Sequence, residues 1–168
     1  MTLRGDRVSV RPVRPDDVER LTAIVREPGV AAWWGSYDAD RVRDELIEPE
    51  ADKVVYAIEA DGEVIGLIQY YEENDPDYRH ASIDLFVSTA WQGRGYGTEA
   101  LRVVARHLFE ERGHHRLTID PSATNERAIG AYEKVGFRPV GVMRQYERGP
   151  DGTWRDGLLM DLLARELR

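Results

Sequence analysis

The sequence predicts a mixed α/β (α+β) fold in which a strongly twisted β-sheet carries helices on both faces. From residue 81 to residue 120, a β-type segment, a glycine-rich turn, a helical pattern and a second β-type segment follow one another, and such a unit places its two strands in parallel. Elsewhere, pairs of β-type segments are joined by short turns, which favours antiparallel pairing. Because 168 residues can enclose a self-sufficient core, we expect a single domain over residues 1–168.

The N-terminal part of the chain is expected to form one strand and two helices. Residues 8–13 alternate apolar and polar side chains, and because Pro12 has no N–H group we expect an edge strand. Pro15 begins a helix whose apolar residues recur at helical spacing. A second helix is expected from Ala39 to Ile47.

The rest of the chain supplies the remaining strands and two longer helices. Strands at 54–59 and 63–71 flank Asp61-Gly62, a turn dipeptide suited to positive φ. The strand at 81–87 leads through the glycine-rich turn into a helix from Thr98 to Glu111. After these come a strand at 116–120, a helix that begins at 124–127 and ends at Gly136, and antiparallel strands at 138–143 and 157–163.

The composition argues against several classes of protein. The formal net charge is −8 and no basic stripe is present, so we expect no nucleic-acid partner. The chain has no cysteine, which excludes disulfides and thiol catalysis, and its four histidines form no His-x-x-x-His pair, so we expect no metal. No apolar run approaches the roughly 20 residues that span a bilayer, so we expect no membrane partner and a cytoplasmic protein. The expected oligomeric state is a monomer or a homodimer.

The glycine-rich turn is Gln92-Gly93-Arg94-Gly95-Tyr96-Gly97, between a strand and the start of a helix. Three glycines at alternating positions leave backbone N–H groups unshielded, and the helix N-terminus adds partial positive charge. Together these features suit a pyrophosphate, with a plain tight turn as the alternative. The spacing matches neither the Gly-x-x-x-x-Gly-Lys-Ser/Thr loop of NTP-binding proteins nor the Gly-x-Gly-x-x-Gly turn of dinucleotide-binding proteins.

A second motif runs from Asp120 to Phe137. Asn125 and Tyr132 are seven residues apart, which is two helical turns, so both project from one face of a helix. Taken by itself, the pattern is also compatible with Asn125 as a helix cap and Tyr132 as a core aromatic residue.

The two motifs, in this order and about 30 residues apart, resemble the Gln-x-x-Gly-x-Gly and Asn-x-x-Ala-x-x-x-Tyr-x-x-x-Gly-Phe motifs of the GNAT superfamily of N-acetyltransferases. The chain is similar to the aminoglycoside 6′-N-acetyltransferases at Trp33-Trp34-Gly35, Tyr70-Tyr71, Ile83-Asp84 and Asp120-Pro121-Ser122. Residues 144–163 instead resemble the RimJ-like protein N-acetyltransferases. The two similarities point to different acceptors.

The resemblance implies acetyl-CoA as the cofactor and direct transfer of the acetyl group to an amine in a ternary complex. It implies Tyr132 as the general acid for the departing thiolate. Arg94 would counter phosphate charge, with a solvated loop cation as the alternative, and Asn125 would hydrogen-bond pantetheine or fix the preceding loop. The implied cofactor-binding residues are Phe86, Val87, Gln92, Gly93, Arg94, Gly95, Tyr96, Gly97, Thr98 and Asn125.

Asp84 is the predicted catalytic base. It alternates with apolar neighbours in a strand, where a charge is costly unless it is paired or lines a cavity. It also matches an acidic position proposed as base or amine anchor in the aminoglycoside enzymes. One alternative is that Asp84 forms a salt bridge. The other candidates for the base are Glu72, Glu73 and Asp120.

At least one of Trp33 and Trp34 is expected to form a pocket wall for the acceptor, with burial of both in the core as the alternative. The expected acceptor-binding residues are Trp33, Trp34, Tyr71, Glu72, Glu73 and Asp120.

We therefore expect an acetyl-CoA-dependent N-acetyltransferase whose acceptor is a small-molecule primary amine of the polycationic aminoglycoside type. The acidic composition is compatible with such a substrate. The alternatives within enzymes are acetylation of a protein N-terminus and acylation of another small or siderophore-type amine. A non-catalytic acyl-CoA-binding regulatory module is the alternative of a different class.

Overall fold

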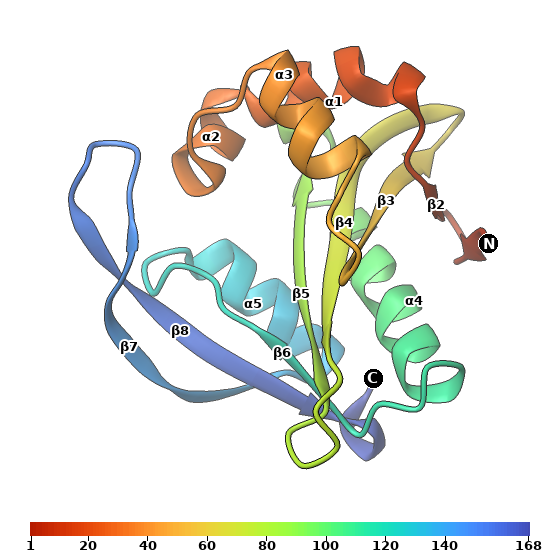
Figure 1. The fold of residues 1–168 in the computed structure, drawn as a ribbon, viewed down its shortest axis with the longest axis vertical. Helices are drawn as coiled ribbons and strands as arrows, with labels where there is room; N and C mark the ends of the chain where they lie inside the picture. The colour runs from red at the N-terminus through yellow and green to blue at the C-terminus, as the bar shows by residue number, and fades with distance from the viewer.

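The structure, a computed structural model that describes residues 1–168, contains an eight-stranded sheet in the order β1-β2-β3-β4-β5-β6-β8-β7 (Figure 1). Only β5 and β6 pair in parallel, whereas the other neighbouring pairs are antiparallel, which confirms the predicted mixed sheet. The strands are β1 (Leu3–Arg4), β2 (Ser9–Pro12), β3 (Lys53–Ala60), β4 (Glu63–Glu73), β5 (His80–Val87), β6 (Arg116–Ile119), β7 (Arg138–Arg148) and β8 (Trp154–Leu163).

Helices cover both faces of the sheet. The helices are α1 (Val18–Val25), α2 (Pro28–Trp34), α3 (Ala39–Val42), α4 (Tyr96–Glu110) and α5 (Glu126–Val135). Successive side chains of β5 point to opposite faces, so Ile83 packs in the core with Leu101 of α4, while Phe86 packs in a second core with Leu21 of α1. None of the helices is both long and apolar enough to cross a membrane.

The parallel strands β5 and β6 stay together only briefly. They pair at Ala81 with Leu117 and at Ser82 with Thr118, and beyond these pairs they diverge (Figure 1). The antiparallel ladder between β4 and β5 continues to Val87 on the other side of β5. The second half of β5 therefore has a strand partner on one side only, and its other backbone edge is open to a ligand.

Two predictions about the N-terminal part were wrong. β2 is not an edge strand, because it lies between β1 and β3. β1 reaches only as far as Ser9 and Val10, so Pro12 lies beyond it and needs no donor there. The sequence prediction left residues 28–34 between its first two helices without a helix of their own, but Trp33 and Trp34 form the end of α2, which begins with Pro28 at its first position.

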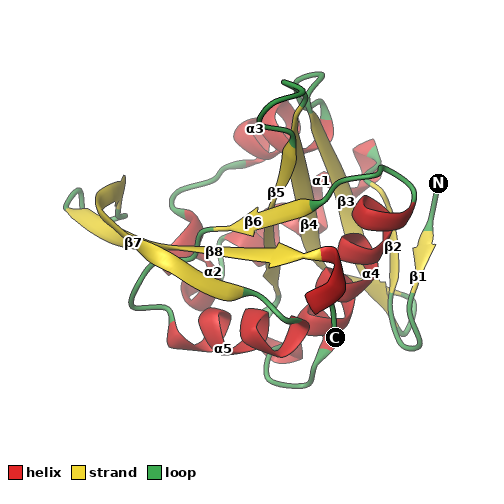
Figure 2. Cartoon of the chain, turned by 90° about the horizontal axis from the view of Figure 1, so that it is seen from below, coloured by secondary structure: helices red, strands yellow, loops and turns green.

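The C-terminal hairpin is longer than predicted. β7 and β8 extend past the expected limits of 138–143 and 157–163 and project beyond the helices (Figure 2). Their register shifts between Met143 and Glu147, where Gln145 has a positive φ of 49°. This β-bulge lies just beyond Met143, where the predicted strand ended, and β7 continues past it. The turn at Asp61-Gly62, with φ of 51° and 79°, is confirmed.

Gly66 of β4 lets the backbones of β4 and β5 approach closely. A Cβ at this position would lie 2.2 Å from the Phe86 carbonyl oxygen, so we expect Gly66→Ala to lower the free energy of unfolding by about 1–3 kcal/mol. Gly130 inside α5 is the matched control, because a Cβ there meets no atom within 4 Å. Gly130→Ala should raise the free energy of unfolding by roughly 0.5–1 kcal/mol. Urea unfolding measures both, and a Gly66→Ala protein as stable as the parent would contradict this packing.

Candidate active site

A cavity of about 410 Å³ lies where β5 and β6 separate. Its walls come from α2, the second half of β5, the start of α4, the end of β6 and the first half of α5. It brings together most of the predicted site residues: Trp33, Trp34, Asp84, Phe86, Val87, Gln92, Gly95, Gly97, Thr98, Asp120, Asn125 and Tyr132.

The first turn of α4 brings free backbone N–H groups to this cavity. Gly95 precedes the helix in a left-handed conformation with φ of 85°. The N–H groups of Tyr96, Gly97 and Thr98 have no backbone acceptor, as is usual at a helix start. Gly97 allows β5 to lie close to the first turn of α4, because a Cβ on Gly97 would be 3.2 Å from Val87 Cγ2. A 15-residue helix with free N–H groups and glycine at the cavity fits a diphosphate.

Backbone groups of β5 also face the gap that opens between β5 and β6. The Ser88 N–H donates to the Ile65 carbonyl of β4 at 2.7 Å. Because backbone groups of successive strand residues point to alternate sides, the N–H groups of Leu85 and Val87 point away from β4 and toward the gap. The Val87 carbonyl accepts a hydrogen bond from Gln92 Nε2 at 2.8 Å.

Gln92 and Arg127 join the two sides of the gap. The Gln92 side chain is bonded to β5, and its Oε1 accepts a hydrogen bond from Arg127 of α5. Arg127 also lines the cavity. It is a cation beside the first turn of α4 that the sequence prediction did not include.

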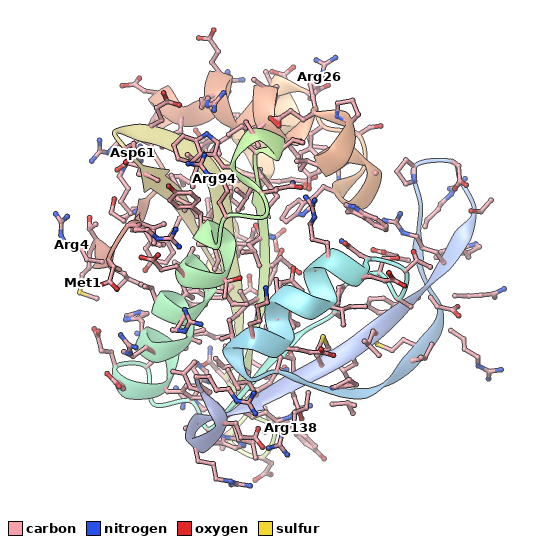
Figure 3. The ribbon with its side chains drawn as sticks, turned by 180° about the vertical axis from the view of Figure 1, so that it is seen from behind. Met1, Arg4, Arg26, Asp61, Arg94 and Arg138 are labelled. Carbon is pink, nitrogen blue, oxygen red and sulfur yellow. The ribbon has the colours of Figure 1, made fainter.

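Three predicted cofactor-binding residues lie outside the cavity wall. Gly93 supplies a turn with φ of 72°. The Arg94 guanidinium lies near the start of α4 (Figure 3), 5.1 Å from the Trp91 ring centroid and 5.2 Å from that of Tyr96. Tyr96 is itself buried in the core. The aromatic stacking therefore accounts for the position of Arg94 without a phosphate.

Asn125 caps α5 and also lines the cavity. Its Oδ1 accepts a hydrogen bond from the Ala128 N–H at 3.3 Å, and its own N–H donates to the Ser122 carbonyl at 2.9 Å. The helix cap, which was one of the two interpretations of the motif, is therefore present. It orients α5 so that Tyr132 also reaches the cavity wall.

Asp84 and Asp120 place two carboxylates in one cavity. Burial raises the pKa of Asp84 to about 6, and the negative charge of Asp120 adds to this shift, while the Gln69 side chain opposes it. Burial also raises the pKa of Asp120, against a hydrogen bond that its carboxylate accepts from the Tyr146 hydroxyl. Asp84 is thus a carboxylate that exchanges its proton close to neutral pH.

The Tyr132 phenol, unlike the Asp84 carboxyl group, keeps its proton at neutral pH. Burial, followed by the charges of Asp84 and Asp120, raises the pKa of its phenol further above the ordinary value of 10.0. The phenol therefore keeps its proton at a pH where Asp84 has lost its own. A proton acceptor and a proton donor consequently line the same cavity.

The end of α2 forms an aromatic wall. The Trp34 ring meets the Phe86 ring edge to face at a centroid distance of 4.8 Å. Arg155 of β8 donates to the carbonyls of Ala32 at 2.8 Å and Trp33 at 3.1 Å, and its guanidinium is 5.5 Å from the centroid of the Trp33 ring. Both tryptophans line the cavity, and Arg155 ties this wall to the β7–β8 hairpin.

The remaining predicted acceptor-binding residues lie farther along β4, outside the cavity wall. Glu72 accepts hydrogen bonds from Arg112 and His114, each at 2.8 Å, and these lower its pKa to about 2. Glu73 accepts one from the Asp75 N–H in the next turn at 2.8 Å, and Tyr71 lies beside Lys53. The structure therefore does not bring Tyr71, Glu72 and Glu73 to the cavity.

Sequence reasoning missed four residues of this region: Gln69 and Arg127, which line the cavity, and Tyr146 and Arg155, which contact its lining from the β7–β8 hairpin. Gln69 carried a signal, because it is a polar residue in an apolar strand, and it is 5% exposed and pairs with Asp84 across the β4–β5 ladder. Tyr146 and Arg155 carried none, since the bulge that directs this hairpin has no clear sequence signature.

Known proteins share both the sequence pattern and the fold. Residues 7–138 match the profile of the Acetyltransferase (GNAT) domain. The chain is 30% identical to aminoglycoside N(6')-acetyltransferase type 1 of Klebsiella pneumoniae over 171 residues, covering 90% of this chain and 82% of that protein. It is 26% identical to spermidine N(1)-acetyltransferase of Escherichia coli strain K12, covering 95% and 87% respectively. The structure of Mycobacterium smegmatis RimJ in complex with CoA-disulfide aligns with a TM-score of 0.84 at 27% identity, covering 99% of this chain and 88% of that one.

The profile spans most of the chain, and the alignment with the K. pneumoniae enzyme covers nine tenths of it. The cavity agrees with this relationship, because it combines the start of a glycine-capped helix with a proton acceptor and a proton donor. The chain belongs to the GNAT acetyltransferase family and is an N-acetyltransferase that uses acetyl-CoA.

Proposed function

We propose that the protein transfers the acetyl group of acetyl-CoA directly to a primary amine of a polycationic small molecule of the aminoglycoside type. The observation that carries this proposal is the pair of carboxylates, Asp84 and Asp120, in the cavity that also contains Tyr132 and the start of α4. Two neighbouring carboxylates favour an acceptor with more than one positive charge. The K. pneumoniae and E. coli relatives are named for an aminoglycoside and for spermidine, both of which carry several amino groups.

The chain offers suitable partners for each part of acetyl-CoA. The N–H groups of Gly97 and Thr98, with the Arg127 guanidinium, would hold the diphosphate. Asn125 and the open edge of β5 would hold pantetheine. The cofactor supplies an activated acetyl group and a thiol leaving group. Direct transfer requires no nucleophilic side chain, which suits a chain without cysteine.

Asp84 is the proposed base. With a pKa of about 6 it is mostly ionised at neutral pH, whereas an alkylamine with a pKa near 10 is mostly protonated. The carboxylate therefore attracts the ammonium group and then accepts its proton. Asp120 remains available for a second ammonium group of the same acceptor.

Tyr132 and the β5 backbone are proposed to act on the leaving group and on the acyl oxygen. The protonated phenol holds the proton that the leaving group takes up. The Val87 N–H, directed into the gap, can donate to the acyl oxygen as negative charge develops on it.

Acetylation of a protein N-terminus is the second candidate. The long, projecting β7–β8 hairpin favours it, because such a surface can hold a peptide beside the cavity (Figure 2). The chain also shares 27% identity with M. smegmatis RimJ. The two candidates differ in the number of positive charges on the acceptor.

The acceptor class is tested by measuring CoA release with kanamycin, with spermidine and with a peptide that has a free N-terminus. We expect saturable turnover with kanamycin and a kcat/KM for the peptide at least about tenfold lower, because one ammonium group leaves a buried carboxylate unpaired. Turnover with the peptide alone would overturn the polycationic acceptor. Calorimetry with CoA accompanies the assay, and a lack of CoA binding would contradict the entire proposal.

Tyr132→Phe tests the general acid. Removing the phenol hydroxyl should lower kcat by about 10²–10⁴-fold and leave the calorimetric affinity for CoA unchanged, because only proton donation is lost. Tyr78→Phe is the matched control, since its side chain is 75% exposed, and it should keep full activity. Unchanged kcat in Tyr132→Phe would exclude Tyr132 as the acid.

Asp84→Asn tests the base and its effect on stability. The variant should lose activity at neutral pH and recover it as rising pH deprotonates the amine. The folded-state pKa of about 6 lies above the ordinary value of 3.8, so the folded protein binds more protons in this window and stability falls as pH rises through it. Asp84→Asn removes that loss, and calorimetry should show a larger gain in Tm, relative to the parent, at pH 8 than at pH 4.

The exposed Asp77→Asn is the control for both measurements and should change neither. An Asp84→Asn variant with normal activity at neutral pH would exclude Asp84 as the base. A Tm difference that is the same at both pH values would show that burial does not penalise the Asp84 charge.

A further inference from the structure

We propose that Tyr146 is a positioning residue for the acceptor, because its hydroxyl donates to Asp120 Oδ2 and holds that carboxylate in the cavity that Asp84 also lines. The inference rests on the proposed function, since it concerns the group that receives the acceptor's second positive charge. Tyr146 does not line the cavity itself and acts through Asp120.

The β-bulge in β7 directs Tyr146 toward Asp120. Regular pairing of β7 with β8 stops after Met143 and resumes at Glu147. Between them, Gln145 adopts a φ of 49°, and its N–H donates to Asp156 Oδ1 at 2.8 Å. A positive φ outside glycine costs free energy and persists only where the surroundings hold it. Asp156 supplies that restraint, and the next residue, Tyr146, points to the end of β6.

Gly157 of β8 makes room for the Tyr146 ring. A Cβ on Gly157 would lie 2.7 Å from Tyr146 Cδ1, so the ring lies directly over this residue. Gly157 also bridges to Ser122, and the neighbouring Leu158 N–H donates to the Pro121 carbonyl at 2.8 Å. The same piece of β8 therefore holds the backbone that follows Asp120 and supports the ring that holds its side chain.

The hydrogen bond has an electrostatic consequence. Burial raises the pKa of Asp120, and the Tyr146 hydroxyl opposes that shift, so the phenol helps Asp120 to stay ionised. An ionised Asp120 in turn raises the pKa of Asp84. Besides Asp120, the titratable and charged side chains that line this cavity are Tyr37, Asp84 of β5, Arg127 and Tyr132 of α5, and Glu147 of β7. Next to them lie Tyr146 of β7, Arg155 of β8, which pairs with Glu147 at 2.8 Å, and Lys53 of β3, whose charge lowers the pKa of Asp84.

Tyr146→Phe is the first test. It keeps the ring and removes the donor, so the KM for a polycationic acceptor should rise about tenfold while the KM for acetyl-CoA stays unchanged. The acid limb of kcat/KM should move to higher pH, because a polycationic acceptor needs Asp84 and Asp120 both ionised and Asp120 without its donor holds its proton more tightly. Tyr78→Phe is the matched control. An unmoved acid limb, or an equal rise in both KM values, would overturn the proposal.

Gly157→Ala is the second test, because it displaces the ring and keeps the phenol. It should reproduce the selective rise in acceptor KM, and adding Tyr146→Phe to it should cause little further change, since both substitutions break one interaction. Fully additive effects in the double variant would count against the proposal. Thermal unfolding of each variant identifies any general loss of structure.

Carbon-13 NMR titration of the Asp120 carboxyl group separates this inference from the proposed function, because it needs no acceptor. A higher Asp120 pKa in Tyr146→Phe than in the parent supports the positioning role even if no amine in the acceptor screen is acetylated. The same pKa in both proteins overturns it, whatever the enzyme acetylates.

Discussion

The early end of parallel pairing between β5 and β6 is the constraint on which the site depends. After Ser82 and Thr118 the two strands separate, while β4 continues to hold β5 as far as Val87. The strand therefore keeps a rigid position and still offers one open backbone edge. α4 and α5 follow β5 and β6 in the chain, so both begin beside the same gap. The groups proposed to bind the cofactor and the groups proposed as acid and base meet there because the sheet opens at that place.

The cavity wall carries both positively polarised groups and carboxylates. The free N–H groups at the start of α4 and the Arg127 guanidinium lie in its wall, in a chain whose formal net charge is −8. Asp84 and Asp120 supply the negative side, and burial raises the pKa of both. An anionic cofactor and a cationic acceptor would each find complementary charge. The carboxylate pair carries a cost in stability, which is typical of groups kept for function rather than for folding.

The side of the cavity that we propose to hold the acceptor is assembled from distant parts of the chain. Arg155 bonds to carbonyl groups in α2 that lie more than 120 residues away in sequence, and Tyr146 bonds to Asp120. Both residues belong to the β7–β8 hairpin, whose bulge and glycine determine where they point. The hairpin therefore shapes the proposed acceptor side of the cavity, whereas α4, α5 and β5 shape the side proposed to bind the cofactor.

Sequence patterns were sufficient for the mixed sheet, the hairpin turn at Asp61-Gly62, the glycine-rich turn that leads into α4 and the shared orientation of Asn125 and Tyr132, because turn chemistry and helical spacing act over a few residues. The start of α4 is two residues earlier than the predicted Thr98. Long-range contacts, by contrast, determine that Glu72 pairs with Arg112 and accepts a hydrogen bond from His114, that Trp33 and Trp34 end a helix, and that Tyr146 reaches Asp120. These outcomes depend on strand register, a bulge and contacts between distant segments. Such long-range packing has no local sequence signature.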